Sequence, residues 1–243
     1  MYPKFKNKHL EEAMFNPEDY INYKKYSKNL PKKYIIIYQK RLLDDFKKKY
    51  NPKKIELYSL LTVYIYKDIG IVRMTGIGSP NAVTVLEELI ALGGKTFLNI
   101  GAAGGLQSEG IFLCKSALRD EGTSYHYLPH GNYIYPDKEL TKKLGKSLSK
   151  NSLEYKESIT WTIDAPYRET KTEIEHYRKK GISTVEMEAS ALFAVAKIRK
   201  VKIAGCFVVS DLLIKKWEPK FHTVNLRKTL NKVLDTAIDC LTC

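Results

Sequence analysis

Along most of this chain, short apolar runs rich in β-branched residues alternate with segments whose apolar residues recur at helical spacing. When a helix joins two strands of one sheet, the chain crosses over the sheet and the strands run parallel. The predicted strands are 34–38, 60–66, 69–74, 96–100, 111–117, 157–163 and 203–209, and the predicted helices are 41–50, 81–92, 137–150, 172–180, 189–199 and 223–241. We therefore expect an α/β fold, a three-layer sandwich in which helices flank a mostly parallel, mixed central sheet.

The first 33 residues lack this alternation. They are rich in Lys, Asn, Tyr and Pro and show no clean apolar period, which is typical of an irregular or partly helical segment. With 243 residues and 44% hydrophobic content, the chain can bury a sizeable core as one domain. We predict an N-terminal extension at 1–33 and a single domain at 34–243.

Charge and cysteine content narrow the class of protein. The net charge of +14 comes mostly from scattered lysines, whereas arginine is the usual reader of base edges, so a nucleic-acid partner is the least favoured alternative. No window approaches the roughly 20 apolar residues that cross a bilayer, and the lysine-rich N-terminus is unlike a signal peptide, so we expect a cytoplasmic protein without a membrane partner. Cysteines 114, 206, 240 and 243 lack metal-site spacing, and we expect neither metal nor cofactor.

Two glycine-rich segments follow predicted strands. The first, Thr75–Pro80, contains Gly76 and Gly78 and precedes a predicted helix, so its N–H groups can face an anion. A tight turn that needs glycine dihedrals is the alternative. The second segment, Asn99–Leu106, ends another strand. Because ligands of open α/β sheets bind beyond the carboxyl ends of strands, two such ends indicate one pocket.

Acidic residues mark two further positions. Glu186 and Glu188 bracket Met187 just before a helix, where a carboxylate can accept both hydroxyls of a ribose and a thioether offers an apolar floor. An exposed acidic pair favoured by the helix dipole is the alternative. Ser210 and Asp211 follow the strand 203–209, where a partly desolvated carboxyl group can protonate a leaving base, unless Asp211 is simply a turn or N-cap residue.

The order and spacing of these segments resemble the superfamily of nucleoside phosphorylases, uridine phosphorylases and methylthioadenosine/adenosylhomocysteine nucleosidases. Residues 74–106, 119–124, 185–190 and 209–211 carry the resemblance, which covers 34–240 and is most specific in the Glu-Met-Glu sequence. It implies a nucleoside phosphorylase-like sandwich and a homo-oligomer, either dimer, trimer or hexamer, with sites shared across an interface.

The resemblance also implies roles for these residues. Met187 is expected beneath the ribose, Glu188 at its hydroxyls and Glu186 in the same pocket. Asp211, helped by Ser210, is expected to protonate purine N7. Tyr167 is expected near the base, although Pro166 replaces the usual stacking residue. His9, and either Lys53 or Lys54, are expected to reach the site of a neighbouring subunit. A surface histidine is the alternative for His9.

The expected phosphate site departs from the family pattern. The phosphate-binding candidates are Gly76, Gly78, Arg41, Asn99 and Ala102, but Asn99 and Ala102 replace an arginine and a hydroxyl residue, and Arg41 is shifted. We predict a pentosyltransferase of nucleoside salvage, a purine-preferring nucleoside phosphorylase that uses phosphate as co-substrate. A nucleosidase that uses water and a non-catalytic nucleoside-binding protein remain the alternatives.

Overall fold

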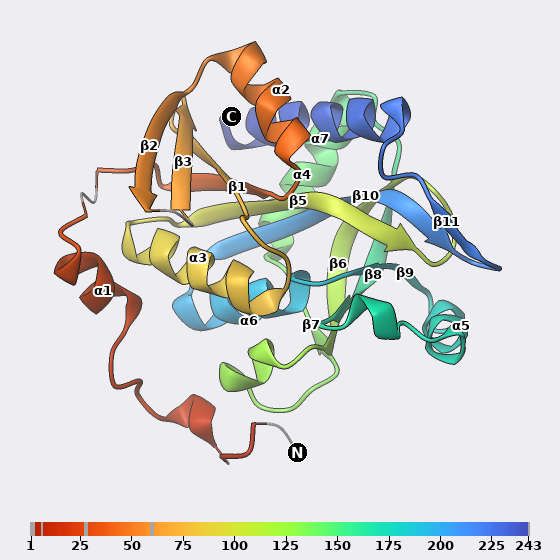
Figure 1. Cartoon of the computed structure of the whole chain (residues 1–243), viewed down its shortest axis with the longest axis horizontal. Coiled ribbons are helices and arrows are strands. Elements are labelled where there is room, and N and C mark those ends of the chain that lie inside the picture. The colour runs from red at the N-terminus through yellow and green to blue at the C-terminus, as the bar shows by residue number, and fades with distance from the viewer. Residues whose placement is uncertain (1–2, 6, 27–28, 59–60, 243) are drawn as a thin grey trace.

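A computed structural model describes residues 3–5, 7–26, 29–58 and 61–242. Within this part of the chain, eleven strands form one mixed sheet with helices on both faces (Figure 1). The strands are β1 Lys33–Ile37, β2 Lys53–Tyr58, β3 Leu61–Tyr66, β4 Ile69–Arg73, β5 Thr96–Gly105, β6 Ile111–Asp120, β7 Tyr133–Ile134, β8 Tyr155–Ile163, β9 Ile182–Glu186, β10 Lys202–Leu213 and β11 Trp217–Pro219. The predicted three-layer α/β sandwich is confirmed.

The α-helices from α2 to α7 lie where the apolar spacing predicts helices, whereas α1 lies in the predicted extension. The α-helices are α1 Pro17–Tyr23, α2 Lys40–Tyr50, α3 Ser79–Ala91, α4 Lys138–Lys150, α5 Lys171–Lys179, α6 Ala189–Arg199 and α7 Val224–Thr242, and the 3-10 helices are η1 Lys8–Leu10, η2 Thr123–His126 and η3 Pro166–Arg168. None of these helices is long and apolar enough to cross a membrane.

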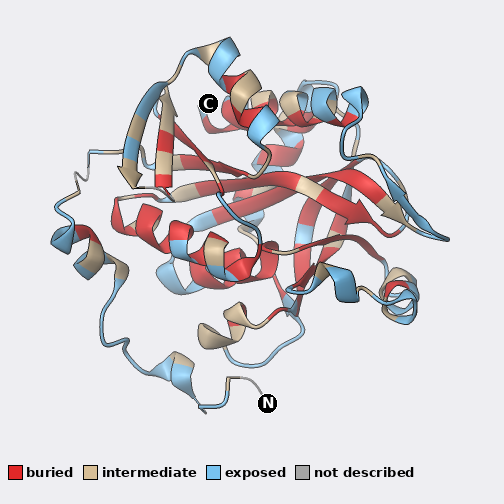
Figure 2. Cartoon of the chain, viewed as in Figure 1, coloured by how far each residue is buried: buried red, intermediate tan, exposed pale blue. Residues whose placement is uncertain are grey.

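The side chains of β1 alternate between the two helical layers, as the period of two in a strand requires. Tyr34 and Ile36 pack with residues of α3 and α6, whereas Ile35 and Ile37 pack with residues of α2, α4 and α7. All four side chains are fully buried, which explains why the strand reads as one continuous apolar run (Figure 2). The core therefore lies on both faces of the sheet.

Five of the strands close into a ring. β5 pairs with both β9 and β10, β10 also pairs with β6, and β8 links β6 to β9. Outside the ring, β1 pairs in parallel with β5 and β4, and β3 and β2 continue the sheet as antiparallel neighbours. The ring brings the carboxyl ends of β5 and β9 and the distal part of β10 together.

Two segments that were expected to follow the ends of strands lie within strands, which corrects the sequence analysis. The glycines at 101–105 belong to β5, and Ser210 and Asp211 belong to β10, which continues to Leu213. A Cβ atom on Gly104 would lie 2.8 Å from Leu213 Cδ1 and 2.9 Å from Val185 Cγ1. Close packing across the ring, not a turn, therefore explains why glycine occupies this position.

Four strands, β2, β7, β9 and β11, have no counterpart among the predicted ones. β2 is largely polar and exposed, so it lacks the alternation that would mark a strand, and it is held by backbone pairing with β3. β9 was expected only as a lead into a helix, but its five residues are all buried in the sheet. The predicted strand 60–66 corresponds to β3, and its first residue, Leu60, lies outside the described residues.

The N-terminal segment contains more structure than an irregular extension. α1 begins with a capping box at Asn16 and Asp19, and it packs against α3 through Ile21, which is 1% exposed. The rings of Tyr20 and Tyr26 each lie 6.4 Å from the ring of Tyr58 in β2. The division into an extension, 1–33, and a domain, 34–243, remains a proposal.

Candidate active site

Glu188 lies at the N-terminus of α6, directly beside the first glycine-rich segment. The backbone N–H of Gly78 donates to Glu188 Oε1 at 2.6 Å, and Glu188 is buried, with 7% of its surface exposed. Gly78 has a φ of 95°, a conformation that favours glycine. Burial raises the pKa of the Glu188 carboxyl group, and the charge of Asp164 raises it further. The structure thus brings together two segments that the sequence analysis assigned to one pocket.

Glu186 ends β9, and protein donors surround its carboxylate. The backbone N–H groups of Glu188 and Ala189 donate to Oε2 at 2.8 and 2.7 Å, and the Thr162 hydroxyl donates to Oε1 at 2.6 Å. The pKa of Glu186 is raised by burial and by repulsion from Glu188. Because both oxygens are engaged, Glu186 holds the start of α6 in place, and this holds Glu188 in turn.

Met187 lies between the two glutamates and is half-buried. Its carbonyl oxygen accepts a hydrogen bond from the Ser79 hydroxyl at 2.7 Å, and its Cε lies 3.9 Å from the position of a Cβ on Gly78. The thioether therefore lies beside the glycine loop, on the same side of the molecule as Glu188.

A β-bulge positions Ser210 and Asp211. The register of β10 against β5 shifts between Val209 and Asp211, so Ser210 is the extra residue. Bulges re-aim side chains and are common beside active sites. Here Ser210 and Asp211 are 3% and 7% exposed, and the Ser210 hydroxyl donates to Asp211 Oδ1 at 2.8 Å.

Gly104 connects the two halves of the site. It is the register partner of Asp211 in β10 and of Val185 in β9, and Val185 directly precedes Glu186. Two neighbouring strand spacings place the Cα atoms of Asp211 and Val185 about 10 Å apart. Asp211 and the Glu-Met-Glu sequence therefore converge on one edge of the ring, across a residue that has no side chain.

Tyr38, which directly follows β1, and Asn99, which lies within β5, form a polar pair. The Tyr38 hydroxyl donates to Asn99 Oδ1 at 2.8 Å, and Asn99 is fully buried with no hydrogen-bond partner for its Nδ2. The pKa of Tyr38 is raised by burial and by the charges of Glu188 and Glu186, so the ring lies near the two glutamates. Sequence reasoning treated Tyr38 only as part of a shifted phosphate loop.

The other phosphate-binding candidates are scattered. Arg41 is exposed in the first turn of α2, Gly76 is exposed, and Ala102 lies in β5 without a side-chain donor. The N–H of Gly78 is engaged by Glu188. The structure does not assemble these residues into a cationic cluster.

Tyr167 and His9 lie away from this centre in the single chain. Tyr167 is 99% exposed on η3, and His9 is partly exposed in η1. A residue that sequence reasoning missed, Glu169, follows η3. Its pKa is raised to about 7 by burial and by the charge of Asp211. Its only signal in the sequence is its place two residues after Tyr167.

The segment 119–124 supports the site from behind. The carboxylate of Glu121 accepts hydrogen bonds from the Ser190 hydroxyl at 2.8 Å and from the Ser124 N–H at 2.9 Å. Arg119 donates from Nε to the Ser124 hydroxyl at 2.9 Å. This buried network ties η2 to the first turn of α6, so its residues act on the position of Glu188 and not on a substrate.

A model of the phosphorylase superfamily matches residues 37–239. The chain belongs to the phosphorylase superfamily. The resemblance inferred from the Glu-Met-Glu and Ser-Asp segments is thereby confirmed. The superfamily consists of enzymes. Relatives of this chain are named as phosphorylases of uridine and guanosine, and such nucleoside phosphorylases are pentosyltransferases.

Two relatives in the superfamily illustrate the range of names. The chain is 30% identical to a uridine phosphorylase from Thermococcus kodakarensis, over 58% of this chain and 57% of that protein. It is 31% identical to a guanosine phosphorylase from Halorubrum lacusprofundi, over 56% of this chain and 58% of that protein. The matched part of the chain thus spans less than two thirds of the length of these relatives.

The fold of the superfamily extends over nearly the whole chain. An AMP nucleosidase structure from Bacteroides thetaiotaomicron superimposes with a TM-score of 0.76 and 19% identity, covering 93% of this chain and 98% of that one. The arrangement of sheet and helices is therefore the nucleoside phosphorylase fold.

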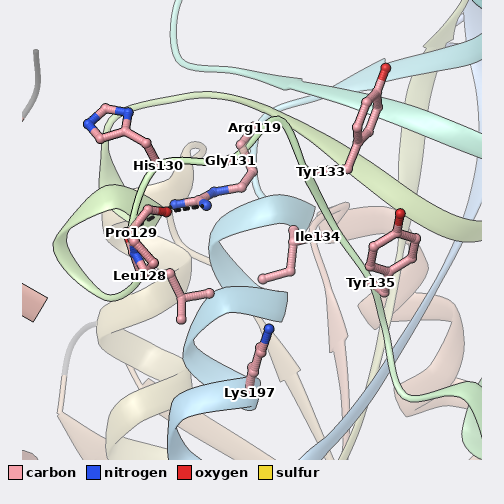
Figure 3. A pocket seen from close by; sticks show the side chains of 9 residues that line it. All are labelled: Arg119, Leu128, Pro129, His130, Gly131, Tyr133, Ile134, Tyr135 and Lys197. Atoms are coloured by element: carbon pink, nitrogen blue, oxygen red, sulfur yellow. Dashed lines mark hydrogen bonds between the residues drawn. The ribbon is translucent and has the colours of Figure 1, made fainter.

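One cavity lies elsewhere on this superfamily member. It encloses about 410 Å³ between α6 and the loop that follows η2, where Lys197, His130 and Tyr135 line it (Figure 3). None of the predicted substrate-binding or catalytic residues lines it. Among the described residues, His, Cys, Asp and Glu side chains do not gather in a group of three or more that would hold a metal ion.

Proposed function

We propose that this chain cleaves the N-glycosidic bond of a ribonucleoside, with a purine as the preferred base. The observation that carries the proposal is the position of Gly104 between Asp211 and Val185, which puts a candidate acid and a candidate ribose-binding carboxylate on one edge of the ring. A sugar and its base need both groups within one nucleoside length. The two backbone pairings support this arrangement.

Glu188 is the proposed ribose-binding residue. A carboxylate offers about four acceptor positions, and the Gly78 N–H uses one of them, which leaves positions for the two ribose hydroxyls. Met187 supplies an apolar surface beside Gly78 that suits the face of the sugar. Glu186 then acts indirectly, because it fixes the helix start that carries Glu188.

Asp211 is the proposed general acid. As the C1′–N9 bond breaks, its electron pair passes to the purine, and Asp211 transfers its proton to N7. The sugar carries oxocarbenium character until a nucleophile captures C1′. The name of the guanosine phosphorylase relative supports a purine, and the uridine phosphorylase relative makes uridine the necessary comparison.

Phosphate is the nucleophile that the names of both relatives favour. Water is the second candidate, because Asn99 is buried without a charge, Arg41 is exposed and the Gly78 N–H is engaged by Glu188. Loss of a charge-assisted contact costs about 1.5–3 kcal/mol, so several such losses would weaken phosphate binding strongly. If the reaction is phosphorolysis, cationic side chains other than these residues must bind the phosphate. The exposed Lys53 of a second subunit is the candidate.

We further propose a cytoplasmic homo-oligomer in which a second subunit completes the site. His9 is partly exposed in η1, and we place it at the 5′-hydroxyl in the site of a second subunit, whereas Tyr167, 99% exposed on η3, stays the candidate near the base. Size measurement by light scattering and activity of mixed oligomers test this. One subunit would carry D211N and the other a His9→Ala change, and recovered activity after mixing would support shared sites.

The decisive experiment incubates the protein with inosine, adenosine, guanosine and uridine, each with and without phosphate. Ribose 1-phosphate formed only with phosphate supports phosphorolysis, whereas free ribose formed without phosphate supports hydrolysis. Base release from uridine, but not from inosine, adenosine or guanosine, would contradict the purine preference. Nucleoside binding by calorimetry with no base release over hours would contradict catalysis and indicate a binding protein.

A further inference from the structure

Asp211 has a second hydrogen-bond donor besides Ser210. The indole Nε1–H of Trp217 donates to Asp211 Oδ2 at 2.9 Å, while the Ser210 hydroxyl occupies Oδ1. Both oxygens of the carboxylate therefore accept hydrogen bonds from the protein. A general acid, by contrast, must carry a proton and direct it at the leaving base.

Trp217 lies on an edge strand of the sheet. It opens β11, a strand of three exposed residues that pairs only with the end of β10 among the described strands. The indole is 59% exposed, and its nearest ring neighbour, Phe221, is 49% exposed at a centroid distance of 6.3 Å. Segments with few buried contacts open at low free-energy cost, so this strand can move without disturbing the ring.

We propose that Trp217 is a positioning residue that holds Asp211 as a carboxylate in the empty site and that a bound purine displaces the indole from Oδ2. This rests on the function proposed above. Once Oδ2 is released, Asp211 takes up a proton from solvent. It transfers this proton to N7 as the C1′–N9 electron pair passes to the base, and the resulting carboxylate again accepts the indole N–H.

Among the described residues of β11, the Trp217 indole supplies the side-chain hydrogen bond to Asp211. The charges of Asp211 and Glu173 both act on Glu169, which lies in the segment after η3. Lys220 follows β11, but its ammonium group pairs with Glu109. The indole N–H of Trp217 and the hydroxyl of Ser210 are thus the donors that the described residues supply to the two oxygens of Asp211.

The chain offers a matched control. Trp161, the other of its two tryptophans, also donates from Nε1 to a carboxylate at 2.9 Å, Asp120 Oδ2, but it is fully buried in β8. Trp217→Phe and Trp161→Phe therefore each remove one indole–carboxylate bond and keep an aromatic ring. We expect only Trp217→Phe to move the alkaline limb of the kcat/KM profile, which reports the empty enzyme, upward by about one pH unit, because the indole no longer competes with the proton for Oδ2.

Fluorescence gives a second readout. In the Trp161→Phe variant, Trp217 is the only indole, and saturating hypoxanthine is expected to shift its emission. Adding Asp211→Ala to this variant removes the acceptor, so the empty protein is expected to show the same shift without ligand. Thermal unfolding confirms that each variant is folded.

Two results would overturn the inference while leaving the proposed function intact. One is binding of hypoxanthine, measured by calorimetry, with no change in Trp217 emission. The other is an alkaline limb that stays in place in Trp217→Phe while the variant remains active. If the parent protein neither binds a base nor cleaves any nucleoside, the proposed function fails and this inference fails with it.

Discussion

Gly78 and Glu188 are 110 residues apart in the sequence, yet the N–H of Gly78 donates to Glu188 Oε1 at 2.6 Å. This bond joins the loop before α3 to the start of α6. It also changes the meaning of the glycine-rich segment, because a backbone donor that was expected to face phosphate is directed at a carboxylate. The loop therefore orients the carboxylate of Glu188.

Gly78→Ala is expected to weaken both stability and substrate binding. A side chain at a φ of 95° costs about 1–3 kcal/mol, and relief of the strain would move the N–H away from Glu188. Urea unfolding and KM for inosine measure the two effects. Gly181→Ala is the control, since Gly181 also has a positive φ, of 81°, but does not contact Glu188. An equal rise in KM in both variants would contradict the prediction.

Glu188→Gln is expected to lower activity while preserving or raising stability. Replacing a charge-assisted hydrogen bond costs about 1.5–3 kcal/mol, which lowers kcat/KM roughly 10- to 100-fold. Because the folded-state pKa of Glu188 is raised, its contribution to stability is lost as pH rises above the unfolded value of 4.5. Melting temperatures at about pH 5 and pH 8 test the sign: the advantage of the glutamine should grow at the higher pH.

Asp211→Asn is expected to lower kcat by about 10²- to 10⁴-fold with little change in KM, because the amide cannot protonate N7. A riboside with 4-nitrophenolate as leaving group needs no such proton. We therefore expect the variant to cleave this substrate at close to the parental rate. Equal losses on inosine and on the nitrophenyl riboside would show that Asp211 does not act as an acid.

Glu169→Gln is expected to remove one pH-dependent component of stability. The folded-state pKa of about 7 lies above the model value of 4.5, so wild-type stability falls between these two pH values as the carboxyl group ionises beside Asp211. The variant should melt at the same temperature as the parent near pH 4.5 and at a higher one above pH 7. The exposed Glu175→Gln on α5 serves as the comparison and should show no such trend.

Gly104→Ala is expected to destabilise the ring by about 1–3 kcal/mol through overpacking. The new Cβ would meet Leu213 and Val185 at 2.8 and 2.9 Å, and it would push apart the strands that carry Asp211 and Glu186. Guanidinium unfolding measures the loss. In Gly131→Ala, the added Cβ meets Arg119 at an ordinary 3.7 Å, so that variant should remain at parental stability.

The sequence predicts the helices well and the ends of the central strands poorly, for identifiable reasons. α3 begins at Ser79 beside Pro80 and ends before Gly93, as its apolar period and punctuation indicate. The glycines of β5 look like a turn because sequence alone does not reveal that β9 and β10 approach them. Close packing between distant strands leaves no local pattern.

The candidate site shows the same division. Glu188 and Asp211 carry recognisable neighbours in the sequence, so they are found without a structure. Trp217 and Glu169 become visible only when the strands pair, because each acts through its distance to Asp211. The roles of His9, across a subunit interface, and of Tyr167, near the base, stay predictions.

The ring of strands has a consequence for biosynthesis. β5 finds its partner β10 only after nearly the whole domain has left the ribosome, and Gly104 then acquires Asp211 as its neighbour. A nascent or half-folded molecule that has not paired these strands holds Glu188 and Asp211 apart, so under the proposed function it cannot cleave a nucleoside. Under the proposed function, catalytic competence therefore depends on this long-range pairing.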